Sequence, residues 1–444
     1  MRGNKYKILK KLGKGSHGTV VLAEDQETLQ MVAIKRIRQQ FCSYEESLSS
    51  RELQILRELH HPNIIALLDA FYEDGRLYLV LEYLESNLCD LLKKENRRLL
   101  SHGTSNRTQG MREDEIRLIT SALLQGLSYI HKQGFVHRDL KPENILCSKT
   151  GAYGPVKIAD FSLATQYCTD ERHSPIRAMT GYVATRWYRA PELLLLNSPI
   201  TAAVPGGRLD TKGLQEMNRF APSADMWSLG VIFAELLLGY PIFPGKTEEQ
   251  QLRLIAQVLG TPPIPEEIFH EANKRIIKSF NKQLFGSSLK PPPRVPFRYR
   301  VQSLMKVLLP PTAPQPLQQL FPDTSPEAIQ IVSDLLVYDP AIRPSASEIQ
   351  RYEFFDRLRT EAHFMESKEL LYNVQNQNMR FSLGFFRPLL PSDEVPYLNS
   401  QDLRDPCEDE CYSNVMHEDS KPSVESKKLV GRYPNISFKF SLRP

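Results

Sequence analysis

Three polar side chains near the middle of the chain have the types and the spacing that phosphoryl transfer needs. Asp139 and Asn144 lie in one short charged loop, and Asp160 lies near the end of a strand-like run that follows. A carboxylate at Asp139 can orient an attacking hydroxyl, while the side-chain oxygens of Asn144 and Asp160 are ligands of the kind that Mg²⁺ prefers. Together these residues predict a site that moves a phosphoryl group.

A helix and two strands are predicted to hold this loop in place. Residues 113–133 have a helical pattern, because apolar side chains recur about every 3.6 residues and Gly134 is a natural C-terminal stop. The apolar positions are Ile116, Ile119, Leu123, Leu127 and Ile130. On the other side of the loop, the short apolar runs 145–147 and 156–161 predict strands. A buried scaffold would therefore present a reactive loop.

A glycine-rich turn near the N-terminus could cover the phosphates of a nucleotide. Residues 6–37 predict three strands, with the turn between the first two. The turn is Gly13-Lys14-Gly15-Ser16-His17-Gly18. Glycines let the backbone approach a triphosphate closely and take conformations that other residues avoid. This spacing is weak when it stands alone, and a plain hairpin turn is the alternative interpretation.

One carboxylate on an apolar helical stripe indicates an ion pair. Residues 44–59 predict a helix in which Glu52 shares a stripe with apolar side chains. These are Leu48, Ile55, Leu56 and Leu59. A carboxylate that faces inward is costly unless it meets a cation. We therefore predict that Glu52 pairs with Lys35, and a solvated surface glutamate is the alternative.

Taken together, these motifs resemble the signature set of the eukaryotic protein kinases. The matching runs are Val32-Ala33-Ile34-Lys35, His137-Arg138-Asp139-Leu140-Lys141-Pro142-Glu143-Asn144 and Asp160-Phe161. The resemblance implies a bilobal α+β fold over residues 6–356, with a small β-sheet lobe carrying one helix (6–82), a hinge (82–86) and a larger, mainly helical lobe (87–356). Residues 357–444 form a C-terminal extension to which it assigns no function.

The resemblance also implies roles for individual side chains. Asp139 would orient the substrate hydroxyl, and Lys141, in the serine/threonine form of the loop, would stabilise the transferred group. Lys35 would contact the α and β phosphates of ATP, with Glu52 as its partner. The metal ligands would be Asn144 and Asp160. We interpret His137 as a packing and hydrogen-bonding residue rather than a base.

ATP and Mg²⁺ are the cofactors that the resemblance implies, and the nucleotide would lie between the glycine-rich turn and the hinge. The residues expected to contact it are Leu12, Gly13, Lys14, Gly15, Ser16, His17, Gly18, Val20, Ala33, Lys35, Glu82 and Leu84.

One position departs from the family pattern. Ser162 stands after Asp160 and Phe161, where the family normally has glycine. Glycine permits positive φ and easy backbone rearrangement, so serine should narrow the conformational range of this segment. Asp160 itself is retained, and we expect an active enzyme with altered regulation.

Residues 179–192 resemble the activation segment of the CMGC group, which contains the MAP kinases, the cyclin-dependent kinases and the RCK family. Thr180 and Tyr182 are the predicted phosphorylation sites, and Arg138 with nearby basic residues would clamp the added charge. Arg189 resembles the arginine that shapes a pocket for proline after the phosphorylated residue. A preference for Ser-Pro or Thr-Pro sites follows as an expectation.

Three further residues are predicted to hold the fold together. Residues 224–238 are apolar on nearly every side, so Asp225 within them must have buried partners, and the family uses that position to anchor the catalytic loop. Arg343 would form a buried ion pair with Glu192, as kinases do; a solvated arginine is the alternative.

Within the group, residues 38–46, 88–92 and 125–135 look most like the RCK family, which includes the male-germ-cell-associated and meiosis-inducing kinases. The Thr-Gly-Tyr triplet looks more like a stress-type MAP kinase, so a MAP kinase proper is the alternative within the class. The alternative of another class is a kinase-shaped scaffold that binds partners without turnover, suggested by Ser162 and by the inserted segments. Retention of every catalytic residue argues against that alternative.

Three segments are predicted to be insertions in the kinase fold. Residues 93–112 are polar and predict a surface loop or a partly disordered segment. Residues 199–221 and the proline-bearing residues 260–324 would enlarge the C-terminal lobe.

The composition indicates an ordinary globular protein. Of its 444 residues, 41% are hydrophobic and 24% are charged, and the net charge of +4 gives no argument for nucleic acid or an anionic membrane. Scattered cysteines and a polar N-terminus predict an intracellular protein of the cytoplasm or nucleus. Its expected partners are protein substrates and an upstream activating kinase, and we expect a monomer.

Overall fold

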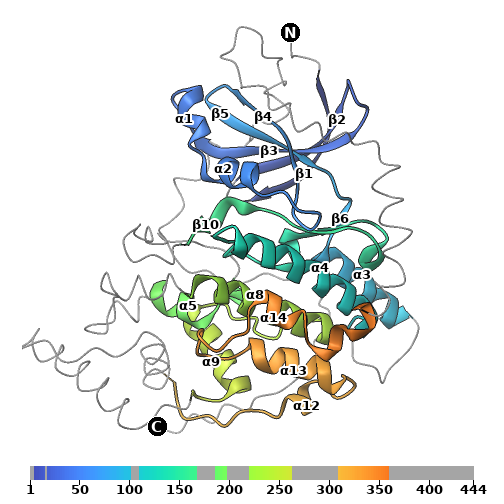
Figure 1. Cartoon of the computed structure of the whole chain (residues 1–444), viewed down its shortest axis with the longest axis vertical. Helices are drawn as coiled ribbons and strands as arrows, with labels where there is room; N and C mark the ends of the chain where they lie inside the picture. Colours follow the sequence, from blue (N-terminus) through green and yellow to red (C-terminus); the bar gives the residue numbers. More distant parts are fainter. Residues whose placement is uncertain are drawn as a thin grey trace, which may run out of the picture. The chain divides into compact units, whose positions relative to one another are not determined.

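The computed structural model of the chain describes residues 5–15, 18–101, 110–167, 186–197, 220–262 and 309–359 (Figure 1). The chain divides into two units, Met1–Leu398 and Asn399–Pro444, and every described residue belongs to the first. The predicted phosphorylation sites Thr180 and Tyr182, the loop residues Ser16 and His17, and most of the C-terminal extension lie outside the described residues.

The N-terminal part is an antiparallel sheet of five strands in the order β1-β2-β3-β5-β4. The strands are β1 (Tyr6–Gly15), β2 (Gly18–Asp25), β3 (Met31–Gln40), β4 (Leu67–Glu73) and β5 (Arg76–Glu82). The central strands are rich in β-branched and other apolar residues and are buried, as the run Leu77 to Leu81 shows. Gly18 allows β2 and β3 to approach, because a Cβ there would lie 2.0 Å from the Arg36 carbonyl oxygen.

The region predicted as one helix over residues 44–59 is two helices, so this prediction was wrong. The helices are α1 (Tyr44–Leu48) and α2 (Arg51–Glu58). Ser49 ends α1, because both its backbone N–H and its hydroxyl donate to the Glu46 carbonyl oxygen, the hydroxyl at 2.6 Å. Serine side chains compete in this way with the helical hydrogen bonds. The break leaves Glu52 in the first turn of α2.

The C-terminal part is mainly helical. Its α-helices are α3 (Leu88–Ser101), α4 (Glu113–Lys132), α5 (Pro191–Asn197), α8 (Ala221–Leu238), α9 (Glu248–Leu259), α12 (Leu317–Leu320), α13 (Pro326–Leu335) and α14 (Ala346–Ile349). Two of these match their predicted bounds closely, since α4 ends where Gly134 takes a φ of 80° and α8 ends at Gly239 with a φ of 77°. The prediction of a bilobal α+β fold is confirmed.

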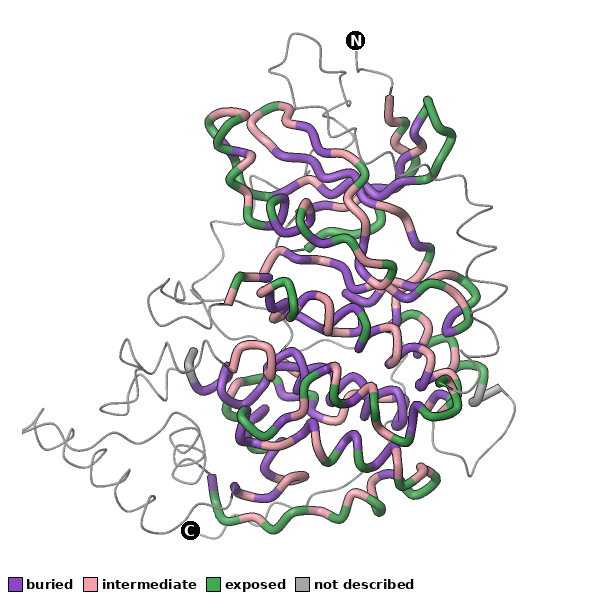
Figure 2. The backbone as a smooth tube through the Cα atoms, viewed as in Figure 1, coloured by how far each residue is buried: buried purple, intermediate pink, exposed green. Residues whose placement is uncertain are grey.

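Helix α8 is the centre of the helical core. It is long and apolar enough to cross a membrane by length and composition, but 83% of it is buried inside the protein (Figure 2). Every residue from Ala224 to Leu238 is buried. Asp225 and Glu235 therefore carry carboxyl groups into the core and need partners there.

The predicted loop over residues 93–112 was wrong for its first part, because α3 continues to Ser101. The charged residues that suggested a loop form the solvated face of an amphipathic helix, while Leu88 and Leu92 are buried on the other face. Arg98 pairs with Glu95 one turn earlier, at 2.6 Å. Residues 102–109 lie outside the described residues.

Short strands and 3-10 helices complete the described structure. The strands are β6 (Ser86–Asn87), β7 (Phe135–Val136), β8 (Ile145–Cys147), β9 (Val156–Ile158) and β10 (Thr165–Gln166), and the 3-10 helices are η1 (Pro142–Asn144), η2 (Gly151–Tyr153), η3 (Phe161–Leu163), η4 (Arg186–Tyr188) and η5 (Glu353–Phe355). The strand predicted over 156–161 ends at Ile158, because Asp160 takes a left-handed backbone conformation and caps η3.

A buried ion pair joins distant parts of the helical core, as predicted. Arg343 donates from both terminal nitrogens to the two carboxylate oxygens of Glu192, at 2.6 and 2.8 Å. Its guanidinium also donates to the Ser223 carbonyl oxygen and lies 5.0 Å from the centre of the Trp227 ring. The Arg343 side chain is 0% exposed, so the pair is fully desolvated.

We predict that Arg343→Ala lowers the free energy of unfolding by about 3–5 kcal/mol, because it leaves the Glu192 carboxylate buried without a counter-charge. Urea unfolding followed by circular dichroism measures the change. The exposed Arg351, changed to alanine, is the control and should alter stability by less than about 0.5 kcal/mol. Equal losses in both variants would contradict the assignment.

Candidate active site

The charged loop is anchored from beneath by Asp225 of α8. Its carboxylate accepts hydrogen bonds from the backbone N–H groups of His137 and Arg138, at 2.9 and 2.8 Å, and contacts His131 Nε2 at 2.9 Å. Burial alone would raise the pKa of Asp225, but the hydrogen bond and charge of His131 together with the His137 amide lower it below its usual value. Arg138 has a φ of 69°, a left-handed conformation that these two amide bonds hold in place.

His137 connects the loop to the segment that carries Asp160. The ring is fully buried, Nε2 lies 3.0 Å from the Ala159 carbonyl oxygen, and Nδ1 accepts the Asp139 amide at 3.3 Å. This pattern requires the neutral ring with its proton on Nε2. The ring also packs edge-on against Phe161, with 5.0 Å between centroids. The interpretation of His137 as a packing residue is confirmed.

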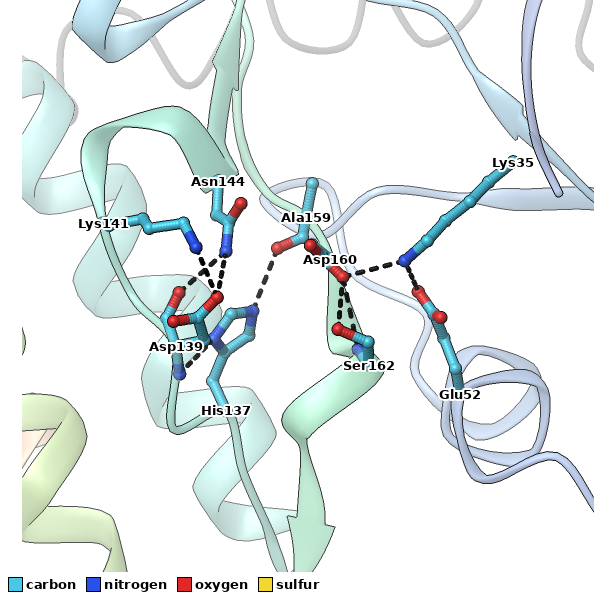
Figure 3. Close-up of polar contacts among 9 residues, drawn as sticks. All are labelled: Lys35, Glu52, His137, Asp139, Lys141, Asn144, Ala159, Asp160 and Ser162. Carbon is cyan, nitrogen blue, oxygen red and sulfur yellow. Dashed lines mark hydrogen bonds and ion pairs between the residues drawn. The ribbon is translucent and has the colours of Figure 1, made fainter. Parts of the chain in front are cut away.

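Asp139, Lys141 and Asn144 meet in one cluster (Figure 3). Lys141 Nζ lies 2.6 Å from Asp139 Oδ2, and the Asn144 amide nitrogen donates to the Asp139 carbonyl oxygen at 2.8 Å and to Oδ2 at 3.1 Å. The Asp139 carboxylate is therefore held by two donors from its own loop. Because its nitrogen faces Asp139, the Asn144 amide turns its oxygen away from that residue (Figure 3).

Lys35 joins the sheet to two other elements through its ammonium group. Its Nζ lies 2.6 Å from Glu52 Oε1 of α2 and 2.8 Å from Asp160 Oδ1, and the predicted pairing with Glu52 is confirmed (Figure 3). Both members of that pair are 7% exposed. Burial alone would lower the pKa of Lys35, but the charges of Glu52 and Asp160 raise it above its usual value, so the lysine is cationic.

The metal-binding candidates Asn144 and Asp160 fit Mg²⁺ better than a softer ion. Both offer oxygen ligands, and the Asp160 side chain is 30% exposed, so a cation can reach it. Among the described residues, no group of three or more His, Cys, Asp and Glu side chains is placed to hold a metal. A magnesium ion bound here would therefore complete its coordination with water and nucleotide oxygens, as Mg²⁺ usually does.

The predicted nucleotide contacts form two groups in the N-terminal sheet. Leu12, Gly13, Lys14 and Gly15 lie at the exposed end of β1, and a Cβ at either of these glycines would meet no atom within 4 Å. That open space suits the approach of a ligand to the backbone. Val20 and Ala33 lie on the neighbouring strands β2 and β3.

Glu82 at the end of β5 uses its side chain and its backbone N–H for contacts within the protein. Its carboxylate accepts the Ala66 amide at 2.7 Å and pairs with Lys157 at 2.7 Å, and its own N–H donates to the Ala66 carbonyl oxygen. The sequence did not predict that the Glu82 carboxylate pairs with Lys157 and the Ala66 amide. Leu84 follows two residues later and is buried.

A small pocket lies beside Asp139, and of its lining residues only Arg189 was predicted to shape a pocket. Its lining residues are Arg138, Asp139, Leu140, Tyr188, Arg189, Leu193, Ala224 and Ser228. Tyr188 is held on its inner side, because its hydroxyl donates to Glu235 Oε2 at 2.6 Å and its carbonyl oxygen accepts the Ser228 hydroxyl at 2.7 Å. Sequence reasoning missed Glu235, although a carboxyl group in an apolar helix is the same signal that identified Asp225.

Burial raises the pKa of Glu235 from 4.5 to about 7, despite the hydrogen bond from Tyr188. The folded state therefore holds the proton more tightly than the unfolded chain. This contribution to stability is complete below pH 4.5 and is lost as the pH rises through 7.

We predict that Glu235→Gln, which does not titrate, gains stability relative to the wild type by up to about 3 kcal/mol between pH 5 and pH 8. Urea unfolding at both pH values measures the difference. The exposed Glu353, changed to glutamine, is the control. A difference between Glu235→Gln and wild type that does not depend on pH would show that Glu235 is ionised throughout.

The sheet, the helical core and this cluster define a phosphotransferase site of the protein-kinase type. A cationic lysine, a carboxylate–amide pair of oxygen ligands and a loop carboxylate are the parts that such a site requires. The family model described as "Protein kinase domain" matches residues 6–355, and the chain belongs to this family.

Individual relatives support the resemblance to the RCK family. The chain is 35% identical to the mouse serine/threonine-protein kinase MAK over 374 residues, which are 83% of this chain and 49% of that protein. It is 36% identical to the mouse serine/threonine-protein kinase ICK over 354 residues, covering 79% and 45%. Cyclin-dependent kinase F-3 of Oryza sativa subsp. japonica is 33% identical over 352 residues, covering 79% and 65%. MAK and ICK are RCK kinases, and the chain spans about half the length of each.

Proposed function

We propose that the protein is an ATP- and Mg²⁺-dependent serine/threonine protein kinase. The observation that carries this proposal is the convergence of Lys35, Glu52 and Asp160 beside the cluster of Asp139 and Asn144. The printed names of MAK and ICK, serine/threonine-protein kinases, support the choice of substrate hydroxyl.

The side chains have distinct tasks in this reaction. Asp139, held by Lys141 and Asn144, orients the substrate hydroxyl and receives its proton as the oxygen bonds to the phosphoryl group. Lys141 and Lys35 place positive charge where the phosphate oxygens gain negative charge. Bound MgATP would supply the phosphoryl group, with ADP as the leaving group, and Asp160 and Asn144 would hold the metal.

We place the residue that follows the substrate serine or threonine next to the small pocket beside Asp139. Arg189 is 7% exposed and lines this pocket together with Tyr188 and Leu193. The wall next to the reactive carboxylate is thus shaped by a buried arginine and apolar groups. These features support the proposed preference for Ser-Pro and Thr-Pro sites.

Control by phosphorylation is the second part of the proposal. Burial lowers the pKa of Arg138, as do the positive charges of Arg51 and Arg189, while Asp225 opposes this shift. Guanidinium groups gathered in this way gain stability when an anion joins them. A phosphate on Thr180 or Tyr182 is the proposed anion, supplied by an upstream kinase or by the protein itself.

The scaffold alternative receives no support from the site. Ser162, which motivated it, leaves the ion pair between Lys35 and Glu52 in place and does not displace Asp160 from Lys35. A purely non-catalytic protein has no need of this arrangement.

We expect Asp139→Asn to lower kcat by about 10²–10⁴-fold, because the variant cannot accept the substrate proton, while the affinity for MgATP changes little. Transfer from radiolabelled ATP to a Ser-Pro peptide measures kcat, and calorimetry measures nucleotide affinity. The exposed Asp323, changed to asparagine, is the matched control. Equal labelling by Asp139→Asn and wild type would end the assignment.

For the phosphate clamp, we expect Arg51→Gln to reduce the stimulation that activation-segment phosphorylation gives by about tenfold or more, the effect of losing a hydrogen bond to a charged group. The ratio of kcat for phosphorylated and unphosphorylated protein is the readout, with phosphorylation of Thr180 and Tyr182 verified by mass spectrometry. Arg38→Gln, at an exposed position of β3, is the control. An unchanged ratio in Arg51→Gln would remove Arg51 from the clamp.

A further inference from the structure

We propose that Ser162 is a positioning residue for the magnesium–nucleotide site, and that its hydroxyl holds the Asp160 carboxylate ready for the metal. This chain has serine where the family pattern has glycine, so the contact involves an atom that glycine lacks. The inference rests on the proposed role of Asp160 as a metal ligand.

The contact is direct and short. Ser162 Oγ lies 2.7 Å from Asp160 Oδ1, while the Ser162 backbone nitrogen lies 3.4 Å from the same oxygen (Figure 3). A hydrogen bond of 2.7 Å from a hydroxyl is strong, whereas an amide at 3.4 Å contributes little. With glycine in this position, residue 162 would offer Asp160 only the long amide contact.

The hydroxyl acts on the same oxygen as the lysine. Lys35 Nζ lies 2.8 Å from Asp160 Oδ1, so two good donors converge on one carboxylate oxygen from different directions. An aspartate held by a single donor can still rotate about its side-chain bonds. Two donors fix the carboxylate plane, and the second donor comes from the segment of Asp160 itself.

The backbone of this segment accepts a side chain at position 162 without strain. Among the described residues that are not glycine, positive φ occurs only at Leu29, Asp74, Arg138 and Asp160, so Ser162 does not need the freedom of glycine in this conformation. Phe161, between Asp160 and Ser162, is fully buried and packs against His137. This packing holds the middle of the segment in place. The strained residue is Asp160, and the Ser162 hydroxyl supports it.

A carboxylate that is already oriented loses less conformational freedom when it binds a cation. Neutral donors to metal-binding carboxylates strengthen metal binding in this way, by orienting the ligand from the second layer of contacts. Competition between the donor and the cation for the same oxygen would have the opposite effect. The two effects change the magnesium requirement in opposite directions.

The test measures how much Mg²⁺ the full-length protein needs to bind a non-hydrolysable ATP analogue. Calorimetric titrations at a series of Mg²⁺ concentrations give the midpoint for wild type, Ser162→Ala, Ser162→Thr and Ser162→Gly. We expect Ser162→Ala and Ser162→Gly to raise the midpoint by about three- to tenfold, the range that one hydrogen bond supplies. Ser162→Thr keeps the hydroxyl and should stay within about twofold of wild type.

Binding of adenosine without Mg²⁺ is the control, since it reports on folding and on the base site but not on the metal. It should be equal in all four proteins. If Ser162→Ala fails to bind adenosine, Ser162→Gly, which adds no side chain, takes its place in the comparison.

The outcomes separate this proposal from the one on which it rests. A wild type whose nucleotide binding ignores Mg²⁺ would overturn the metal role of Asp160 and the role of Ser162 with it. A magnesium-dependent wild type with an equal or lower midpoint in Ser162→Ala would overturn the role of Ser162 alone. An equal rise in the alanine and threonine variants would also overturn it, because the hydroxyl would then not be the cause.

Discussion

The site depends on one buried cation held between two carboxylates. Lys35 belongs to the sheet, Glu52 to α2, and Asp160 to the segment that follows β9, so the Lys35 ammonium joins three elements. The buried charges of Lys35 and Glu52 are compensated only where the sheet and α2 meet. An uncompensated buried charge costs several kcal/mol, and no apolar contact nearby could offset that. The ion cluster therefore restricts how these three elements can be arranged relative to one another.

A series of hydrogen bonds connects the Asp160 segment to the helical core. Asp225 of α8 holds the backbone of the charged loop, His137 of that loop holds the Ala159 carbonyl oxygen, and Asp160 comes next in the chain. The bonds of His137 to Asp225 and to Ala159 are buried, and a buried hydrogen bond is costly to leave unmade. The proposed base, the proposed metal ligands and the lysine assigned to the phosphates are thus positioned by one connected scaffold, as preorganised catalysis requires.

Sequence patterns predicted those residues of the scaffold whose own chemistry shows what kind of partner they need. A carboxylate in an apolar stripe needs a cation or buried donors, and so Glu52 and Asp225 could be identified without coordinates. Features decided by competition between local hydrogen bonds, or by a neighbour far along the chain, could not be predicted. The break at Ser49 depends on local competition for a carbonyl oxygen, and the side chain of Glu82 depends on Lys157, which lies far along the chain. The helical extension of α3 was hidden because a solvated helix face and a polar loop have similar composition.

A crystal structure of the full chain with Mg²⁺ and a non-hydrolysable ATP analogue tests the central claim most directly. We expect oxygen atoms of Asp160 and Asn144 at about 2.1 Å from the metal, with Lys35 still paired to Glu52 and its ammonium against a phosphate. A nucleotide bound away from these side chains would contradict the account. So would a metal held by other ligands while Lys35 and Glu52 stand apart.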